Sequence, residues 1–367
     1  MRGLLSATLI VRDEEDVLGA CLGSICDVVD EIVIVDTGSV DASIEIARSF
    51  GALVREHAWT GDFAEPRNRA LELASGEWIL YIDADEELAP VTRGQVEGLL
   101  TDVPEVAFRL LLRPTPQSTP YLEYRIWRND PRIRFEGLIH EKVTPAIHAV
   151  AETDGRPIGR SDLLLSHAGY EGDQTHKHLR NLPLLQAELK VDPDNMFNLH
   201  HFARVQEGLG RPDEAERALE RAVEVARGPG RKDPIGCLVF GELVRLRRDL
   251  GKDASGLLEE ARSRYPGNYL LLFHEGRLRV DEARYAEALD VFDRLLAVDQ
   301  TVLADEGPSY DQAIFGVLSH EARALCLMGL ERYDEAAEAY ASAEECAPDD
   351  PSLPVKQQLA RARARAA

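Results

Sequence analysis

Cysteine is scarce in this sequence, and the few thiols present do not suggest a cross-linked framework. The 367 residues include five cysteines, and no two of them form a Cys-x-x-Cys pair. An odd number of scattered cysteines is not typical of a small secreted domain held together by disulfides. We therefore expect reduced thiols in a cytoplasmic protein. The five are Cys21, Cys26, Cys237, Cys326 and Cys346.

Long apolar runs are absent as well. No stretch approaches the eighteen consecutive apolar residues that a transmembrane helix requires, so the sequence predicts no membrane span. The apolar stretch near the N-terminus is short, alternates like a strand and runs into the acidic residues 13–16. This stretch therefore does not fit a signal peptide.

Basic residues are also few relative to acidic ones. Lysine and arginine number 42 against 65 aspartates and glutamates, which gives a formal net charge of −23 at pH 7. Binding along a nucleic-acid backbone depends on clustered lysines and arginines that displace counterions. We therefore predict no nucleic-acid partner, although a local anion-binding site is compatible with this charge.

The sequence does contain enough apolar residues, 44% of the chain, for two or three globular domains. In its first part, short β-branched runs alternate with amphipathic segments of helix length. This order predicts a parallel sheet whose strands are joined by crossover helices. The expected strands are residues 4–12, 31–36, 52–58 and 77–83, and the expected helices are residues 14–25, 42–50 and 65–74.

Further along the chain, strand-like segments are separated by Pro, Asn and Asp. We expect them to add antiparallel strands at one end of the sheet. A long helix over residues 175–191 should then lead out of this region. The four additional segments are residues 106–114, 121–129, 133–143 and 161–170.

The second half carries an internal repeat. Three segments share a turn, an acidic or alanine residue followed by Glu-Ala, and a large apolar residue one turn later. Their alanines Ala215 and Ala288 are 73 residues apart, a gap that a weaker unit over residues 233–266 fills, and Ala336 follows 48 residues after Ala288. This pattern resembles the tetratricopeptide repeat, in which small alanines let paired helices pack closely. The three segments begin at Gly210, Ala283 and Glu331.

Polar clusters follow two of the expected strands and one later apolar segment. Ligands of α/β proteins bind beyond the carboxyl ends of the parallel strands. Asp36 ends the second strand, and Gly38 and Ser39 allow a tight turn after it. Asp83 and Asp85 follow the fourth strand, where two carboxylates can reach a hard divalent cation that also takes phosphate oxygens. The third cluster contains Gly137, His140 and Glu141.

Four blocks in order over about residues 4–90 resemble a family 2 glycosyltransferase with the GT-A fold: LSATLIVRDEEDVLGACLGSI, EIVIVDTGSVDAS, WTGDFAEPRNRAL and EWILYIDADEEL. The later blocks EGLIHEKV and LSHAGYEGDQTHKHLRNLPLL resemble a bacterial subgroup that adds tetratricopeptide repeats, as in peptide S-glycosyltransferases of the sublancin type. The resemblance implies a Rossmann-like mixed α/β sheet domain over residues 1–174, a linking helix over 175–191 and an all-α repeat domain over 192–367.

The resemblance also implies a site for a nucleotide-sugar donor. Asp36 would accept a hydrogen bond from the uracil or ribose, although it would equally fit a helix cap. Asp85 would hold Mn²⁺ or Mg²⁺, a Lewis acid that neutralises the diphosphate leaving group. His167 would be a further metal ligand, or else a histidine of the core. The donor-binding residues implied are Val11, Arg12, Glu14, Asp36, Gly38, Ser39, Arg67, Asp83, Ala84 and Asp85.

A carboxylate after a glycine-bearing loop serves as the base in such families, and Glu141 holds that place here. The sequence has His140-Glu141 where Glu-Asp is common, so His140 is the alternative base or a metal ligand. Trp127 and Arg128 are candidates to bind the acceptor, although an aromatic strand residue also fits a core.

We therefore predict a metal-dependent inverting glycosyltransferase that uses a nucleotide-sugar donor, in particular a UDP-sugar. Repeat arrays commonly receive an extended polypeptide in a concave groove, which predicts a peptide or protein acceptor. Alternatively, the repeats make a homodimer. Two other functions stay open: a glycosyltransferase of cell-surface glycan or lipopolysaccharide assembly, and a catalytically inactive repeat scaffold.

Overall fold

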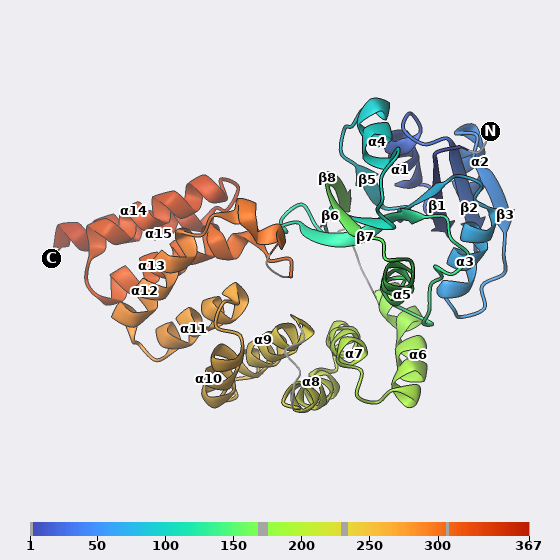
Figure 1. The fold of residues 1–367 in the computed structure, drawn as a ribbon. Coiled ribbons are helices and arrows are strands. Elements are labelled where there is room, and N and C mark those ends of the chain that lie inside the picture. Colours follow the sequence, from blue (N-terminus) through green and yellow to red (C-terminus); the bar gives the residue numbers. More distant parts are fainter. Residues whose placement is uncertain (1–2, 168–174, 229–233, 306–307, 367) are drawn as a thin grey trace. The chain divides into compact units, whose positions relative to one another are not determined.

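The computed structural model of the protein describes residues 3–167, 175–228, 234–305 and 308–366. The chain forms two compact units (Figure 1). Unit 1 comprises Met1–Val191 with Ala304–Ser309, and unit 2 comprises Asp192–Leu303 with Tyr310–Ala367. No helix within the described stretches has both the length and the apolar character needed to cross a bilayer.

Unit 1 is built on an eight-stranded mixed sheet with the order β3-β2-β1-β4-β7-β6-β8-β5. The first four strands of the chain pair in parallel with one another, as predicted. β6 and β7 continue the sheet in antiparallel pairs, also as predicted. The strands are β1 (Leu5–Val11), β2 (Glu31–Asp36), β3 (Leu53–Glu56), β4 (Trp78–Tyr81), β5 (Glu86–Leu88), β6 (Ala107–Arg113), β7 (Tyr121–Arg128) and β8 (Ile158–His167).

Both faces of this sheet are covered by helices, which explains why the central strand β1 is almost entirely buried. Leu22 of α1 and Leu100 of α4 belong to the core on one face. Leu71 of α3 and Ile147 of α5 belong to the core on the other. The helices are α1 (Leu18–Ile25), α2 (Ser43–Ser49), α3 (Ala64–Leu73), α4 (Arg93–Leu100), α5 (Thr144–Asp154) and α6 (Thr175–Val191).

Two strand predictions require correction. Residues 133–143 do not form a strand but an irregular loop with one isolated bridge between Glu136 and Lys142. Gly137 and His140 in this loop have φ angles of +107° and +53°, which do not fit a pleated strand. β8 is antiparallel to β5, as predicted, but parallel to β6. Residues 168–170 of the predicted strand lie outside the described residues.

Unit 2 consists of paired helices, which confirms the predicted repeat architecture. The first helix of each of four pairs ends before a residue with positive φ: Gly210, Gly251, Ala283 or Glu331. Three buried alanines of the second helices, Ala215, Ala288 and Ala336, are 0% exposed. The helices are α7 (Met196–Gly208), α8 (Pro212–Ala226), α9 (Pro234–Asp249), α10 (Ser255–Arg264), α11 (Tyr269–Asp281), α12 (Tyr285–Leu296), η1 (Gln300–Asp305), η2 (Gln312–Phe315), α13 (Val317–Gly329), α14 (Tyr333–Cys346) and α15 (Ser352–Ala366).

Candidate active site

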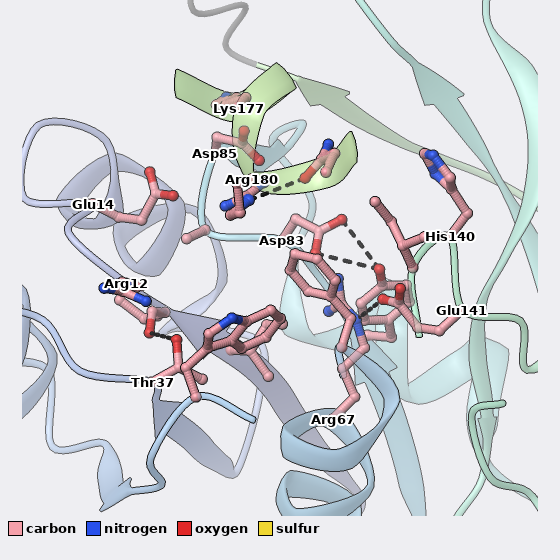
Figure 2. A pocket seen from close by; sticks show the side chains of 18 of the residues that line it. Arg12, Glu14, Thr37, Arg67, Asp83, Asp85, His140, Glu141, Lys177 and Arg180 are labelled. Carbon is pink, nitrogen blue, oxygen red and sulfur yellow. Dashed lines mark hydrogen bonds and ion pairs between the residues drawn. The ribbon is translucent and has the colours of Figure 1, made fainter. Parts of the chain in front are cut away.

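A pocket of about 490 Å³ opens in unit 1 where the parallel strands end. Val11 at the end of β1, Thr37 after β2 and Tyr81 at the end of β4 line it, so the pocket lies at the edge where α/β proteins bind ligands (Figure 2). Ten of the residues predicted from the sequence line this single pocket. They are Val11, Arg12, Glu14, Arg67, Asp83, Ala84, Asp85, His140, Glu141 and His167.

Arg67 of α3 is the centre of the charged network in this pocket. Its Nη2 donates to Asp83 at 2.8 Å, and its Nε forms an ion pair with Glu141, which is 74 residues away in the sequence. The guanidinium also lies over the ring of Tyr81, 4.5 Å from the ring centroid. One buried arginine thus fixes two carboxylates that come from distant parts of the sequence (Figure 2).

Asp83 is held in its charged form. Burial alone would raise its pKa, but the charges of Arg67 and Arg125 outweigh burial and lower the pKa to about 2. The hydroxyl of Tyr81 adds hydrogen bonds of 3.2 and 3.3 Å to the same carboxylate. Asp83 is therefore a fixed negative acceptor, suited to hydroxyl groups of a ligand.

Asp85 and His167, the two metal ligands predicted from the sequence, lie in contact. His167 Nε2 is 3.0 Å from a carboxylate oxygen of Asp85. The register of β8 beside β5 brings them together, because His167 pairs with Glu86. Donating a hydrogen bond to the Asp85 carboxylate raises the pKa of His167. Within the described residues, no cluster of three or more metal-binding side chains forms.

Glu14 reaches the same pocket from the loop after β1. That loop is tied to the loop after β2, because the Glu14 amide donates to Ser43 Oγ at 2.8 Å and the Asp13 amide to Ser39 Oγ at 3.0 Å. Burial, and then the charge of Asp85, raise the pKa of Glu14 to about 7. With this pKa, Glu14 is about half protonated near pH 7, so its protonation changes when the charge in the pocket changes.

The loop over residues 133–143 delivers Glu141 and His140. Asn68 of α3 clamps this loop by accepting from the Phe135 amide at 2.8 Å and donating to its carbonyl at 2.9 Å. The side chain of Glu141 is only 8% exposed. His140 lines the pocket beside it from a left-handed backbone conformation, a strained state that is common at functional sites.

Asp36, Gly38 and Ser39 do not line the pocket. The buried Asp36 carboxylate accepts from the amides of Gly38 and Ser39 at 2.9 and 3.0 Å and from the Ser39 hydroxyl. Its hydrogen bonds are therefore used to form the turn after β2. Thr37, the residue next to it, lines the pocket instead.

The structure also corrects the acceptor-binding prediction. Trp127 is 1% exposed and packs in the core between the sheet and α5. Arg128 stacks on Trp78, 4.2 Å from its ring centroid, and forms an ion pair with Glu77. Both side chains are occupied by packing, and neither lines the pocket.

The site residues predicted from the sequence include none from α6. Lys177, Arg180 and Asn181 line the pocket, together with the aromatic residues Trp59 and Phe63. The only available signal was the segment HKHLRN, in which Lys177 and Arg180 are three residues apart on one helical face.

Comparisons with known proteins agree with the two-part architecture. Residues 6–107 match the model described as glycosyl transferase family 2, and residues 198–229 and 315–351 match tetratricopeptide repeat models. A TPR repeat-containing protein of Synechococcus elongatus is 37% identical over 174 residues, which cover 46% of this chain and 43% of that protein. The glycosyltransferase SunS of Bacillus subtilis is 24% identical over 273 residues, or 71% of this chain and 63% of SunS.

The chain therefore spans less than two thirds of the length of each of these relatives. Among solved structures, S. aureus TarS 1–349 in complex with UDP aligns over 72% of this chain and 93% of that chain, with 16% identity and a TM-score of 0.37. Taken together, the family matches show that this chain joins a glycosyltransferase domain of family 2 to tetratricopeptide repeats.

Proposed function

We propose that this chain is a metal-dependent inverting glycosyltransferase that moves a sugar from a UDP-sugar onto a side chain of a peptide or protein. The observation that carries the proposal is the convergence of Asp83, Asp85 and Glu141 in one pocket, with Arg67 joining two of them. The different surroundings of these three carboxylates suggest a different role for each.

The residues present fit a divalent cation. Asp85 and His167 offer a carboxylate and an imidazole in mutual contact. Mn²⁺ can bind both groups, whereas Mg²⁺ would bind chiefly the carboxylate oxygen. When bound there, the metal would supply Lewis-acid stabilisation of the diphosphate leaving group. Asp83, which stays ionised, would orient the donor by accepting from its ribose.

Glu141 is the proposed base. It would take the proton of the acceptor nucleophile as the nucleophile attacks the anomeric carbon from the face opposite the departing diphosphate, so the configuration inverts. Arg67 Nε contacts Oε1 of Glu141, which leaves Oε2 to receive the proton. Once Glu141 is neutral, Arg67 is still balanced by Asp83, so the protonated state does not leave an unpaired buried cation.

A polypeptide acceptor is proposed from the presence of the repeats. Stacked helix pairs form extended concave surfaces suited to polypeptide segments. The similarity to the glycosyltransferase SunS covers 71% of this chain, so it extends beyond unit 1 into the repeats. All five cysteines are free thiols, which supports a cytoplasmic location for the reaction.

The test is to incubate the full chain and Mn²⁺ with a panel of UDP-sugars, alone and with synthetic peptides that contain Cys, Ser or Asn. We expect slow release of UDP without acceptor and a gain of one sugar mass on a peptide. Donor consumption without any modified peptide would favour a glycan or lipopolysaccharide acceptor. No consumption of any donor would favour the inactive scaffold.

A further inference from the structure

Two cationic side chains of α6 face the pocket, and the donor and metal roles above do not use them. Lys177 and Arg180 are one turn apart on the same helical face, and both line the pocket with Asp83 and Asp85 (Figure 2). Lys177 lies in the first turn of α6, where the helix dipole adds a positive potential, and Arg180 lies one turn further along. The helix thus presents positive charge to the place where a donor would lie.

Arg180 is held in place without a carboxylate partner. Its guanidinium lies over the ring of Phe63, 5.2 Å from the ring centroid, and its Nε donates to the neutral Oδ1 of Asn181 at 3.0 Å. In the part of the chain that the structure describes, no acid lies within ion-pair distance of it. The aromatic ring and the amide therefore orient the guanidinium but leave its charge unmatched.

The surroundings favour an anion rather than another acidic side chain as the partner. Partial burial lowers the pKa of Arg180, the charge of Glu14 opposes that effect without forming an ion pair, and the charge of Arg12 adds to it. Glu14 is itself driven towards its neutral form by burial. An incoming diphosphate would restore the balance, because a guanidinium binds phosphate oxygens with two parallel hydrogen bonds and an ammonium binds them as a point charge.

We propose that Lys177 and Arg180 form a cationic clamp on the diphosphate of the donor and stabilise it as the leaving group. This inference rests on the proposed function, because it assumes a nucleoside-diphosphate donor. Bond cleavage at the anomeric carbon transfers an electron pair to the β-phosphate oxygen, and the clamp would neutralise that growing charge. The clamp would act from the side of α6, whereas Asp85 acts from the turn before β5 and His167 from the end of β8.

The experiment compares UDP, UMP and uridine as ligands of the full chain by isothermal titration calorimetry in Mg²⁺. The variants are Arg180→Gln, Lys177→Gln and the more conservative Arg180→Lys. The matched control is Lys190→Gln, which removes a charge from the exposed last turn of the same helix, away from the pocket. Circular dichroism checks that each variant keeps the fold.

A charge-assisted hydrogen bond lost on substitution should weaken UDP binding about 10-fold or more. We expect that loss for Arg180→Gln and Lys177→Gln, a smaller loss for UMP and an unchanged affinity for uridine. Arg180→Lys should recover part of the UDP affinity, and Lys190→Gln should behave like the original chain. The kcat for UDP-sugar hydrolysis should fall with the UDP affinity.

Two results would overturn the clamp while leaving the proposed function intact. If Arg180→Gln and Lys177→Gln both leave UDP binding unchanged, the diphosphate does not need these two positive charges. An equal loss for UDP and uridine would assign α6 a packing role through Phe63. If the original chain binds none of the three ligands, the proposed uridine donor is wrong and the clamp fails with it.

Discussion

The pocket of unit 1 and the repeats of unit 2 both contain many arginine–carboxylate pairs, but the sequence distances within the pairs differ. In the pocket, Arg67 pairs with Glu141 across 74 residues. In the repeats, Arg227 pairs with Glu260 and Arg248 with Asp281, each across 33 residues, about the length of one repeat. These two repeat pairs therefore connect neighbouring units, whereas the pocket pair closes a long loop of the fold.

Burial separates the two regions as well. The side chains of Arg67 and Glu141 are 10% and 8% exposed, against 40% and 29% for Arg227 and Glu260. An exposed pair contributes about 1 kcal/mol or less, while breaking a buried pair by removing one partner costs about 3–5 kcal/mol. Each exposed ion pair of the repeats therefore contributes little to stability, whereas losing one partner of a buried pair in the pocket would destabilise the fold much more.

The largest effect should follow from Glu141→Gln. The amide keeps the size of the side chain but cannot accept the acceptor's proton, so sugar transfer should fall about 10²- to 10⁴-fold while UDP binding changes little. The matched control is Glu72→Gln, which removes an exposed carboxylate of α3 that pairs with Arg69. If His140→Ala abolishes transfer and Glu141→Gln is mild, the base is His140.

Asp85→Asn should have the next largest effect. Without a full negative charge the site should bind Mn²⁺ more weakly, and the diphosphate charge would be less well compensated, so turnover should fall about 10²- to 10³-fold. EDTA should have a comparable effect on the original chain. Manganese binding measured directly by electron paramagnetic resonance separates loss of metal from loss of catalysis. Full activity in EDTA would contradict the metal role.

These site residues were predictable to different degrees. The Asp-Ala-Asp segment follows a strand whose apolar run is continuous, so its place at the sheet edge could be inferred. Asp36 ends an equally clear strand, but the sequence alone does not decide between donor contact and capping of the following turn, and in the structure the amides of Gly38 and Ser39 use its carboxylate. Arg180 lies about a hundred residues from Asp83, and only the folded chain brings them together.

Fold prediction succeeded where a periodic pattern marks the element and failed where single residues depart from that pattern. The strand–helix alternation and the repeats depend on short periodic patterns, and the long helix over 175–191 was predicted to the residue. Residues 133–143 are apolar enough for a strand, but two left-handed residues make them a loop. Trp127 was placed at the acceptor because a sequence does not distinguish the two buried faces of a sheet.

A third prediction compares glycines of the two units. A methyl group at Gly276 in α11 would lie 2.8 Å from the ring of Phe292, whereas one at Gly98 in α4 would meet nothing within 4 Å. Gly276→Ala should therefore lower the free energy of unfolding by about 1–3 kcal/mol, because it overpacks the helix pair. Gly98→Ala should raise it by about 0.4–1 kcal/mol. Urea unfolding measures both, and a neutral Gly276→Ala would mean that close helix packing does not limit the repeats.

The last comparison concerns pH, which should act on the two units in opposite directions. Glu14 has a pKa of about 7 in the folded chain against an ordinary 4.5, so between these values the folded state binds more protons than the unfolded state. Its contribution to the stability of unit 1 therefore decreases as pH rises from 4.5 to 7. Burial, and then the charges of Arg248, Arg245 and Arg277, lower the pKa of His274 to about 3.

For His274 the unfolded state binds the extra proton between pH 3 and 6.5, so unit 2 should lose stability as pH falls through that window. The two units can be observed separately, because the three tryptophans at positions 59, 78 and 127 all lie in unit 1. Tryptophan fluorescence would follow unit 1, and helical circular dichroism would chiefly follow unit 2. Glu14→Gln should flatten only the first pH profile and His274→Gln only the second. If either substitution flattens both profiles, the two units unfold together, and the assumption that they unfold separately is wrong.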